Sequence, residues 1–386
     1  MTKQSSIEKS KDLVVSPPPQ ITGAMSKTRI MTYTFAALLV ITIITAILWW
    51  PAMTPHPDLG MMVDLSGFMA MPLGAILLVN ALIAVGVAVV SDFVIGKAAV
   101  DSEVNMMSAA VFGLIVALSY SIGVPTMVSG EMMPIWLLSA PGCFIYVALI
   151  SFIGMVAFKK LQPVVFKGRK IFNPAATAKL LLLLPFMFSS LIVKEHWAPA
   201  MEGGLGVPKL ASNLVDDWGY TIATYLQGCY GLPGAEPSSL NSLMLLTKFH
   251  GWPGGASSIA VIVVGAVLIF LLRDYFKWRI TAAYLGSVAV AAIAMYAIYG
   301  GDLVTRLLFS LFVGSSIFLA FFMATDPATT PYTRTGQIIF GIGLGVLTVL
   351  IQTYMNFFGG ALLALVIMNL TVPLLDRIGI HKPFGR

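Results

Sequence analysis

The sequence has little charge, few cysteines and few histidines for its length. Only 10% of its 386 residues are charged, and it contains two cysteines and four histidines. Cys143 and Cys229 have neither CxxC nor Cys/His spacing, so the chain alone predicts no metal site and no iron–sulfur cluster. No GxGxxG segment follows an expected strand, which excludes a nicotinamide site of the Rossmann type.

A soluble basic domain is also lacking. The net charge is +6, but no polar stretch is long enough to fold into a surface that would carry it to nucleic acid. We therefore expect no nucleic-acid partner, and attribute the excess of Lys and Arg to membrane topology.

Long apolar runs dominate the sequence. Hydrophobic residues make up 58% of the chain and the mean hydropathy is +0.89, more than one soluble core uses. A run of about 17 or more apolar residues can cross a hydrocarbon layer of about 30 Å as a helix. Ten such runs are predicted, at 30–50, 68–91, 104–122, 134–158, 172–193, 256–272, 280–299, 304–324, 336–353 and 357–376.

The predicted fold class is an all-α membrane protein with about ten transmembrane helices. Lipid leaves only helices or closed barrels as spanning structures, and the alternation of polar and apolar residues that barrel strands need is absent. A long segment, 194–255, separates five expected helices from five others. With an odd number in each, related halves would be inverted in the membrane, as in many transporters.

The predicted organisation has five parts. They are a cytoplasmic tail at 1–29, a first five-helix half at 30–193, an external loop at 194–255, a second five-helix half at 256–376 and a cytoplasmic tail at 377–386. The first 28 residues are polar and rich in proline, so we expect no cleavable signal peptide.

The distribution of Lys and Arg predicts the orientation. With a cytoplasmic N-terminus, eighteen of these residues fall in inner segments and three in outer segments, which is the bias of cytoplasmic loops. The expected location is the inner membrane of a prokaryotic cell, as a multi-pass protein with both termini cytoplasmic.

Polar residues stand at the start of the fifth predicted helix, in "FNPAATAKLLLLLPF" (172–186). Asn173 as N-cap and Pro174 at the first helical position make a regular helix start. Lys179 lies six residues further on, about 9 Å along the axis. Its side chain either extends back to the headgroups or faces the bundle interior and pairs with an anionic group.

A second polar element separates the eighth and ninth predicted helices. "ATDPATTPYTRTG" holds an Asp-Pro turn and five threonines. Asp326, Thr329 and Thr330 are predicted either to cap the ninth helix or to bind a phosphate or ribityl chain, because helix starts favour anions. "DPATT" (326–330) also resembles "NPAAT" (173–177), which is a trace of an internal repeat or a chance similarity of two turns.

Four segments, in this order, resemble the RnfD/NqrB family of membrane subunits of Rnf-type and Na⁺-translocating NADH:quinone oxidoreductase complexes. They are "SPPPQITGAMSKTRIM", "KGRKIFNPAATAKL", "ATDPATTPYTRTGQIIFGIGLGVLTVLI" and "IMNLTVPLLDR". The resemblance implies two inverted five-helix halves, bound flavin, and electron transfer within an ion-pumping complex of several subunits.

The resemblance also implies an attached cofactor. The family links FMN through a phosphoester to a threonine in the external loop, and the matching position is Thr224, in "DDWGYTIATYL". Ala223 and Thr224 match the family motif, whereas Thr221 stands for its serine and Ile222 for its glycine. A flavin transferase would be the partner in maturation.

The expected function is therefore an electron-relaying subunit and not a complete enzyme. It would carry FMN on Thr224, a second, non-covalent flavin near "FNPAATAK" and "DPATT", and take its donor and acceptor from other subunits. The alternative is a flavin-free transporter or channel on the same scaffold. Two glutamates of the family motifs are replaced, by Gly255 and Gly359, which favours the alternative.

Overall fold

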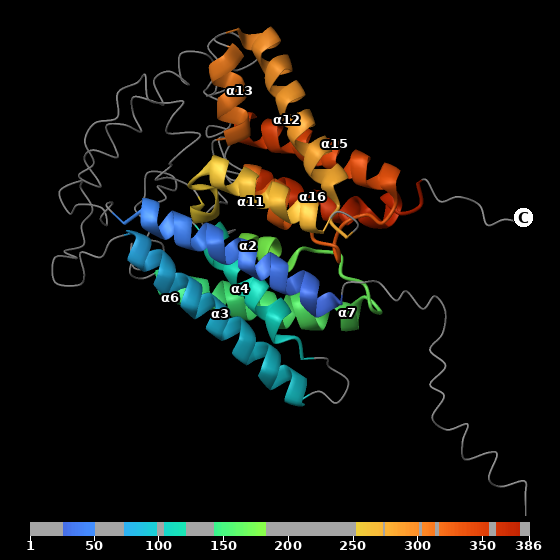
Figure 1. Ribbon diagram of the computed structural model, residues 1–386. Helices are drawn as coiled ribbons and strands as arrows, with labels where there is room; N and C mark the ends of the chain where they lie inside the picture. Colours follow the sequence, from blue (N-terminus) through green and yellow to red (C-terminus); the bar gives the residue numbers. More distant parts are fainter. Residues whose placement is uncertain are drawn as a thin grey trace, which may run out of the picture.

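The computed structural model describes residues 26–50, 73–98, 104–120, 143–182, 252–272, 275–300, 303–312, 316–354 and 360–378 (Figure 1). Helices make up most of these ranges, and no strand occurs in them. The expectation of an all-helical protein is confirmed for this part of the chain.

Residues 26–182 contain the first group of helices. These are α2 (Lys27–Leu48), α3 (Leu73–Ala98), α4 (Met106–Ser119), α6 (Cys143–Ile153), the π-helix η1 (Gly154–Leu161) and α7 (Gln162–Val165). Residues 174–182 are also helical. Because η1 continues α6 directly and leads into α7, these three elements form one helical segment.

Residues 252–378 contain the second group. Its elements are the short 3₁₀ helix η4 (Pro253–Gly255), then α11 (Ser258–Leu271), α12 (Trp278–Tyr299), α13 (Leu303–Phe312), α14 (Ser316–Phe318), the π-helix η5 (Leu319–Met323), α15 (Arg334–Tyr354) and α16 (Gly360–Leu375). In Figure 1 the second group lies above the first, and α11 runs beside α2 where the two groups meet.

Every predicted span overlaps a described helix. Five helical segments, Lys27–Leu48, Gly74–Ala98, Phe144–Val165, Trp278–Ile298 and Arg334–Thr353, are long and apolar enough to cross a membrane by length and composition. Three shorter apolar helices are Met106–Ser119, Ser258–Leu271 and Gly360–Leu375. These helices indicate a multi-pass membrane protein. The number of ten spans and the inversion of the two halves stay predictions.

Several helices begin at a polar side chain that caps the first turn. Ser26 Oγ accepts a hydrogen bond from the Arg29 amide (3.2 Å), and Asn105 Oδ1 accepts one from the Ser108 amide (2.9 Å). Ser257 Oγ does the same for Ala260 N at the start of α11 (3.3 Å). Such caps satisfy amides that the helix itself leaves without a partner.

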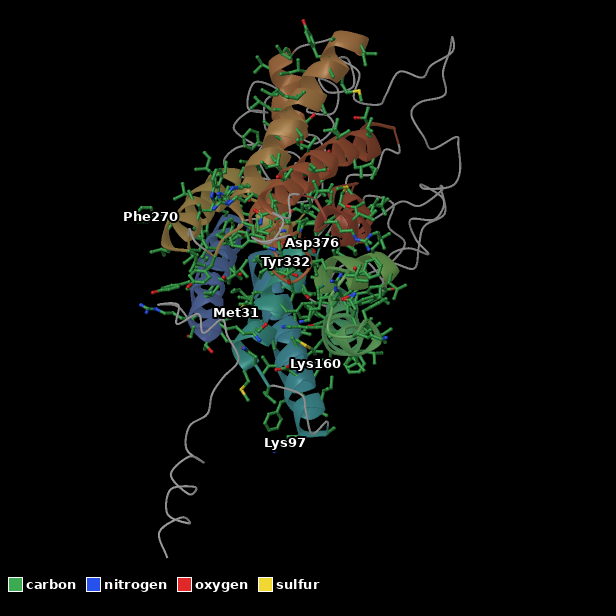
Figure 2. The ribbon with its side chains drawn as sticks, turned by 90° about the vertical axis from the view of Figure 1, so that its right-hand side faces the viewer. Met31, Lys97, Lys160, Phe270, Tyr332 and Asp376 are labelled. Carbon is green, nitrogen blue, oxygen red and sulfur yellow. The ribbon has the colours of Figure 1, made fainter. Side chains whose placement is uncertain are left out.

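One end of the bundle collects several helix ends from both groups. The pKa of Lys170 is lowered by burial, raised by Asp326 and lowered by Lys27, so these three charges lie near one another. Tyr332 N donates to Asp376 Oδ1 (2.8 Å) at the same end, and Figure 2 shows these two residues together. The start of α2, the turn before α15 and the end of α16 therefore share this end.

Helices α12 and α15 pack closely and run parallel. Gly341 faces Ala283 and the Ile280 carbonyl, and one turn later Gly345 faces Ser287 and the Tyr284 carbonyl. Because the contacting residue numbers increase in the same direction along both helices, α12 and α15 are parallel. Glycines spaced four apart let two helix backbones approach, as is common between helices in membranes.

The two groups are joined around η4. Thr45 Oγ1 of α2 donates to the Pro253 carbonyl (3.0 Å). A Cβ added at Gly254 would lie 2.6 Å from the Phe318 ring, so only glycine fits between η4 and α14. The first and second groups thus meet at η4, which accepts a hydrogen bond from α2 and packs tightly against α14 within its own group.

Large apolar side chains cover much of the outer surface. Phe270 is 79% exposed, Leu82 75% and Val290 67%, and Figure 2 shows Phe270 at the periphery. Soluble proteins rarely expose so much apolar surface, whereas a hydrocarbon environment favours it. This surface agrees with the spanning segments.

We predict that Gly345→Leu destabilises the α12–α15 contact. The added Cβ would lie 2.7 Å from the Tyr284 carbonyl oxygen and 3.0 Å from Val288 N, so the helices must move apart, at a cost of about 1–3 kcal/mol for overpacking. Thermal unfolding of the purified protein in detergent measures the change. Gly86→Leu is the control, because a Cβ at Gly86 meets nothing within 4 Å. Equal melting temperatures of the two variants would contradict the contact.

Candidate functional site

Asn173 connects the start of the fifth helix to the end of η5. Its Oδ1 accepts a hydrogen bond from Ala176 N (3.1 Å), which is the expected N-cap. Its Nδ2 donates to the Met323 carbonyl (3.2 Å), 150 residues away in the sequence. The same side chain therefore caps one helix and joins the two groups of helices.

Asn369, in the middle of α16, completes this connection. The orientation of its amide is assigned from its neighbours: with the oxygen toward Asn173 N (2.9 Å) and the nitrogen toward the Thr329 carbonyl (3.2 Å), both groups form hydrogen bonds. Asn369 is fully buried. We call the set Asn173, Met323, Thr329 and Asn369 the junction. It brings "NPAAT" and "DPATT" together.

The junction includes a residue that the sequence analysis did not select. Asn369 stands inside the apolar stretch "IMNLTVPLL". A polar residue within a spanning run is costly unless it bonds inside the bundle, and this is the signal that could have identified it.

The Asp326 turn satisfies its own polar groups. Asp326 Oδ1 accepts from Ala328 N (3.2 Å) and Oδ2 accepts from Thr329 Oγ1 (3.0 Å), while Thr330 Oγ1 donates to the Asp326 carbonyl (2.6 Å). Thr329 and Thr330 are buried. Asp326, Thr329 and Thr330 thus form a closed turn, and the structure places this turn near Asn173.

A threonine of this element caps α15, but it is none of the three residues selected for that role. Thr333 Oγ1 accepts from Gly336 N (3.1 Å), so Thr333 caps the ninth helix. Asp326 and Thr329 bond within their own turn instead, because the turn closes several residues before α15 begins.

Lys179 faces the bundle interior and is 4% exposed. Its ammonium donates to the Ser119 carbonyl at the end of α4 and lies 4.2 Å from the centre of the Trp252 ring. No carboxylate pairs with it among the residues that the structure describes. A helix C-terminus and an aromatic face both favour a cation, and they hold Lys179 where it cannot extend to the headgroups.

Trp252, which contacts this lysine, belongs to an aromatic cluster. Trp252 contacts Phe318 edge to face, with ring centres 6.4 Å apart and an angle of 81°, and Phe318 stacks on Phe322 at 5.3 Å. Trp252 directly precedes η4. The cluster places η4 and the end of α14 against the first group of helices.

One hydroxyl near the junction has no partner. Thr177, one turn after Asn173, has a buried Oγ1 without a hydrogen bond among the described residues. A buried polar atom usually has a partner. The Thr177 hydroxyl thus retains its capacity to form a hydrogen bond.

Lys277 binds the Asp326 turn from the start of α12. Its ammonium donates to the Thr330 carbonyl (2.9 Å), Thr330 Oγ1 (2.8 Å) and the Pro327 carbonyl (3.1 Å). Burial lowers the pKa of Lys277 to about 8, against the opposing effects of Asp326 and Asp376. The sequence analysis used Lys277 only as a marker of orientation.

A buried ion pair lies apart from the junction. Lys160 Nζ, in η1, is 2.7 Å from Asp92 Oδ1 in α3, and the exposed fractions of the two side chains are 18% and 3%. Asp92 Oδ2 also accepts from Asn105 N (2.9 Å). Asp92 stands directly after a predicted span, in the apolar stretch "VVSDFVIG". A carboxylate in such a stretch indicates a buried partner, but the sequence analysis did not use this signal.

The predicted attachment site, Thr224, lies outside the described residues. Within the described ranges, no group of three or more His, Cys, Asp and Glu side chains could hold a metal ion.

We predict that Asp92→Asn destabilises the protein by about 3 kcal/mol, because it removes the carboxylate charge from a buried ion pair. Thermal unfolding in detergent measures the loss. The double variant Asp92→Asn with Lys160→Met removes both charges and should recover part of the stability. A double variant that is less stable than Asp92→Asn would contradict this account.

We predict that Lys277 loses its proton near pH 8, well below the usual 10.5. Between these values the folded protein holds a neutral amine while the unfolded chain holds an ammonium, so the free energy of unfolding rises with pH across that window. The rate of acylation of Lys277 by an amine-reactive reagent, measured by mass spectrometry over a pH series, gives the midpoint of its deprotonation. A midpoint near 10.5 would refute the effect of burial.

Known proteins resemble more than half of this chain. The D subunit of the ion-translocating oxidoreductase complex of Aeromonas hydrophila is 30% identical over 236 residues, which are 56% of this chain and 66% of that protein. The corresponding protein of Stutzerimonas stutzeri is 32% identical over 234 residues, 57% of this chain and 64% of that protein. The chain therefore spans slightly less than two thirds of the length of these relatives.

A third relative aligns over a longer stretch. The D subunit of the Na⁺-translocating ferredoxin:NAD⁺ oxidoreductase complex of Acetobacterium woodii is 28% identical over 285 residues, 73% of this chain and 74% of that protein. The family described as NQR2, RnfD, RnfE matches residues 14–385. The resemblance found in the sequence is confirmed, and the chain belongs to the NQR2, RnfD, RnfE family.

Proposed function

We propose that this chain is a flavin-carrying membrane subunit that relays electrons in an ion-translocating oxidoreductase complex. Its family and the names of its relatives, which are the D subunits of such complexes, support this proposal. The donor, the acceptor and the remaining ion path would belong to other subunits. In the cell membrane both termini would face the cytoplasm, as the distribution of Lys and Arg suggests.

Covalent FMN on Thr224 is the first part of the proposal. A phosphoester requires a hydroxyl, and Thr224 occupies the position that corresponds to the family's attachment site, between Tyr220 and Tyr225. Aromatic rings on both sides would stack on an isoalloxazine ring. A flavin transferase would install the group during maturation.

A second, non-covalent flavin beside the junction is the other part. The observation that supports it is a buried cation without a carboxylate among the described residues, Lys179, together with the unpaired hydroxyl of Thr177. Asn173, Asp326, Thr329 and Thr330 would be the other residues of this site. A flavin supplies one-electron and two-electron transfer when it is bound.

The contribution of Lys179 follows from its surroundings. In its protonated form, Lys179 would stabilise negative charge in a low-dielectric site far more than it would in solution. The Ser119 carbonyl and the Trp252 ring hold the ammonium in place, so little reorganisation would accompany the arrival of an electron nearby. Thr177 would bind and orient through its free hydroxyl.

The alternative is a flavin-free transporter or channel on the same scaffold. Thr329 and Thr330 already donate their protons within the Asp326 turn, which favours a purely structural junction. The replacement of two family glutamates by Gly255 and Gly359 points the same way.

We predict that the chain, produced in its complex with its flavin transferase, is fluorescent in a denaturing gel and that Thr224→Val abolishes the signal. Acid precipitation should release a second flavin, and Lys179→Met should lower electron transfer about tenfold or more, as loss of an electrostatic contact does, while the complex still assembles. Lys97→Gln, at the end of α3, is the control. A dark band and no released flavin would favour the transporter.

A further inference from the structure

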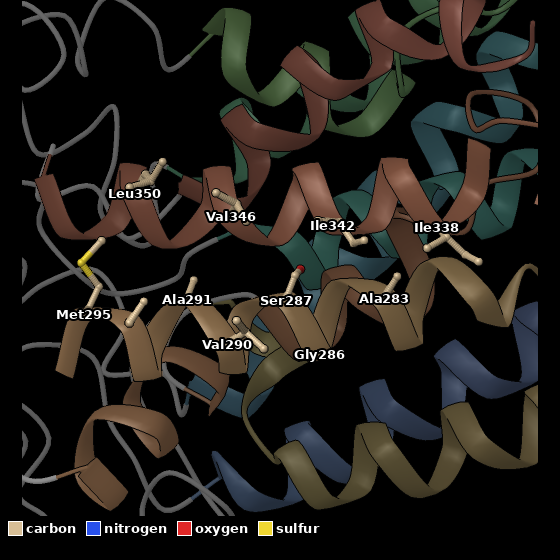
Figure 3. Close-up of a pocket in the computed structure, with 11 residues that line it drawn as sticks. Ala283, Gly286, Ser287, Val290, Ala291, Met295, Ile338, Ile342, Val346 and Leu350 are labelled. Carbon is tan, nitrogen blue, oxygen red and sulfur yellow. The ribbon is translucent and has the colours of Figure 1, made fainter. Parts of the chain in front are cut away.

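An apolar groove runs along the outer side of α12 and α15 (Figure 3). Its volume is about 650 Å³, within the range of about 300–1,000 Å³ for small-molecule sites. Gly286 lines the groove without a side chain that would fill it, and a Cβ added there would meet nothing within 4 Å. Apolar side chains form its walls, among them Ala283, Val290 and Met295 of α12 and Ile338, Ile342 and Leu350 of α15.

The groove offers almost no polar group to a ligand. Among the described residues, Ser287 carries the only polar side chain of the lining, and its hydroxyl already donates to the Tyr284 carbonyl (2.9 Å) and the Gly341 carbonyl (3.3 Å). A quinone head or another polar ring would find no donor there. The lining instead suits a hydrocarbon chain.

The mouth of the groove is basic. Arg279 precedes Ala283 by four residues on α12, and Arg334 precedes Ile338 by four residues on α15. Residues four apart share a helix face, and α12 and α15 run parallel, so both arginines lie at the same end of the groove. Two helix N-termini add partial positive charge there.

The neighbouring charges leave these arginines available. Arg279 lies over the Trp278 ring at 5.0 Å, at the level where amphipathic side chains anchor to headgroups. Asp326 and Asp376 lie close to Lys277, and the hydrogen bonds of Lys277 go to Thr330 and Pro327. In the part of the chain that the structure describes, no carboxylate forms a salt bridge with Arg279 or Arg334.

The length of the groove matches one leaflet. From Ala283 to Met295 the axis of α12 advances about 18 Å at 1.5 Å per residue. Half of a hydrocarbon core of about 30 Å is about 15 Å. A chain that starts at the arginines would therefore end near the middle of the bilayer.

We propose that this groove binds an anionic phospholipid, with one acyl chain along α12 and α15 and the phosphate between Arg279 and Arg334. Guanidinium groups bind phosphate in a bidentate manner. A transmembrane helix of a partner protein would cover the groove without requiring the two arginines. The site does not depend on the flavin proposal.

Photocrosslinking of the intact complex tests the assignment. Benzoylphenylalanine replaces Val290, which is 67% exposed at the rim, and the complex is reconstituted in phosphatidylcholine vesicles that contain a minor share of phosphatidylglycerol. Mass spectrometry of the crosslinked peptide identifies the occupant. We expect phosphatidylglycerol to be enriched about tenfold over its share, which corresponds to about 1.4 kcal/mol.

Two pairs of variants separate the headgroup from the chain. Arg279→Gln and Arg334→Gln should each lower the enrichment, whereas Lys97→Gln should keep it. Gly286→Leu should reduce crosslinking to either lipid, whereas Gly86→Leu, also open within 4 Å, should not. Crosslinks in proportion to the vesicle composition, or crosslinks to another polypeptide, would overturn the proposal.

Discussion

The hydrogen bonds of the Asn369 amide are the interaction on which the arrangement of the two groups of helices depends. A buried amide or carbonyl without a hydrogen-bond partner is costly, so the amide of Asn173 and the carbonyl of Thr329 must find their partners within the protein. Asn369 supplies both partners from one side chain. Asn173 adds the contact with Met323, and three segments far apart in sequence are thereby fixed together.

The buried charges follow the same constraint in different ways. Asp92 and Lys160 neutralise each other, while Lys179 relies on a carbonyl and an aromatic ring. A paired charge is expected to act as a structural element, whereas a charge without a counterion retains its field for whatever lies nearby. This difference is why Lys179, and not the ion pair, enters the proposed function.

Much of the architecture could be predicted from the sequence because apolar runs and caps are local signals. The predicted span 280–299 corresponds to α12, and Asn173 forms the expected N-cap. Asn369 and Asp92 could not be assigned partners, since these depend on which helices become neighbours. The π-helices η1 and η5 likewise leave no distinct pattern in the sequence, and Lys179 could be placed inside or outside only once its neighbours were known.

The shared end of the bundle has a topological consequence. The described helices start at Lys27 and finish at Leu375. Lys27 and Asp326 act on the pKa of Lys170, and Asp326 and Asp376 act on that of Lys277, which places both points at the same end of the bundle. A path that leaves one face of a membrane and returns to that face crosses it an even number of times. The predicted number of ten spans is even and agrees with this arrangement.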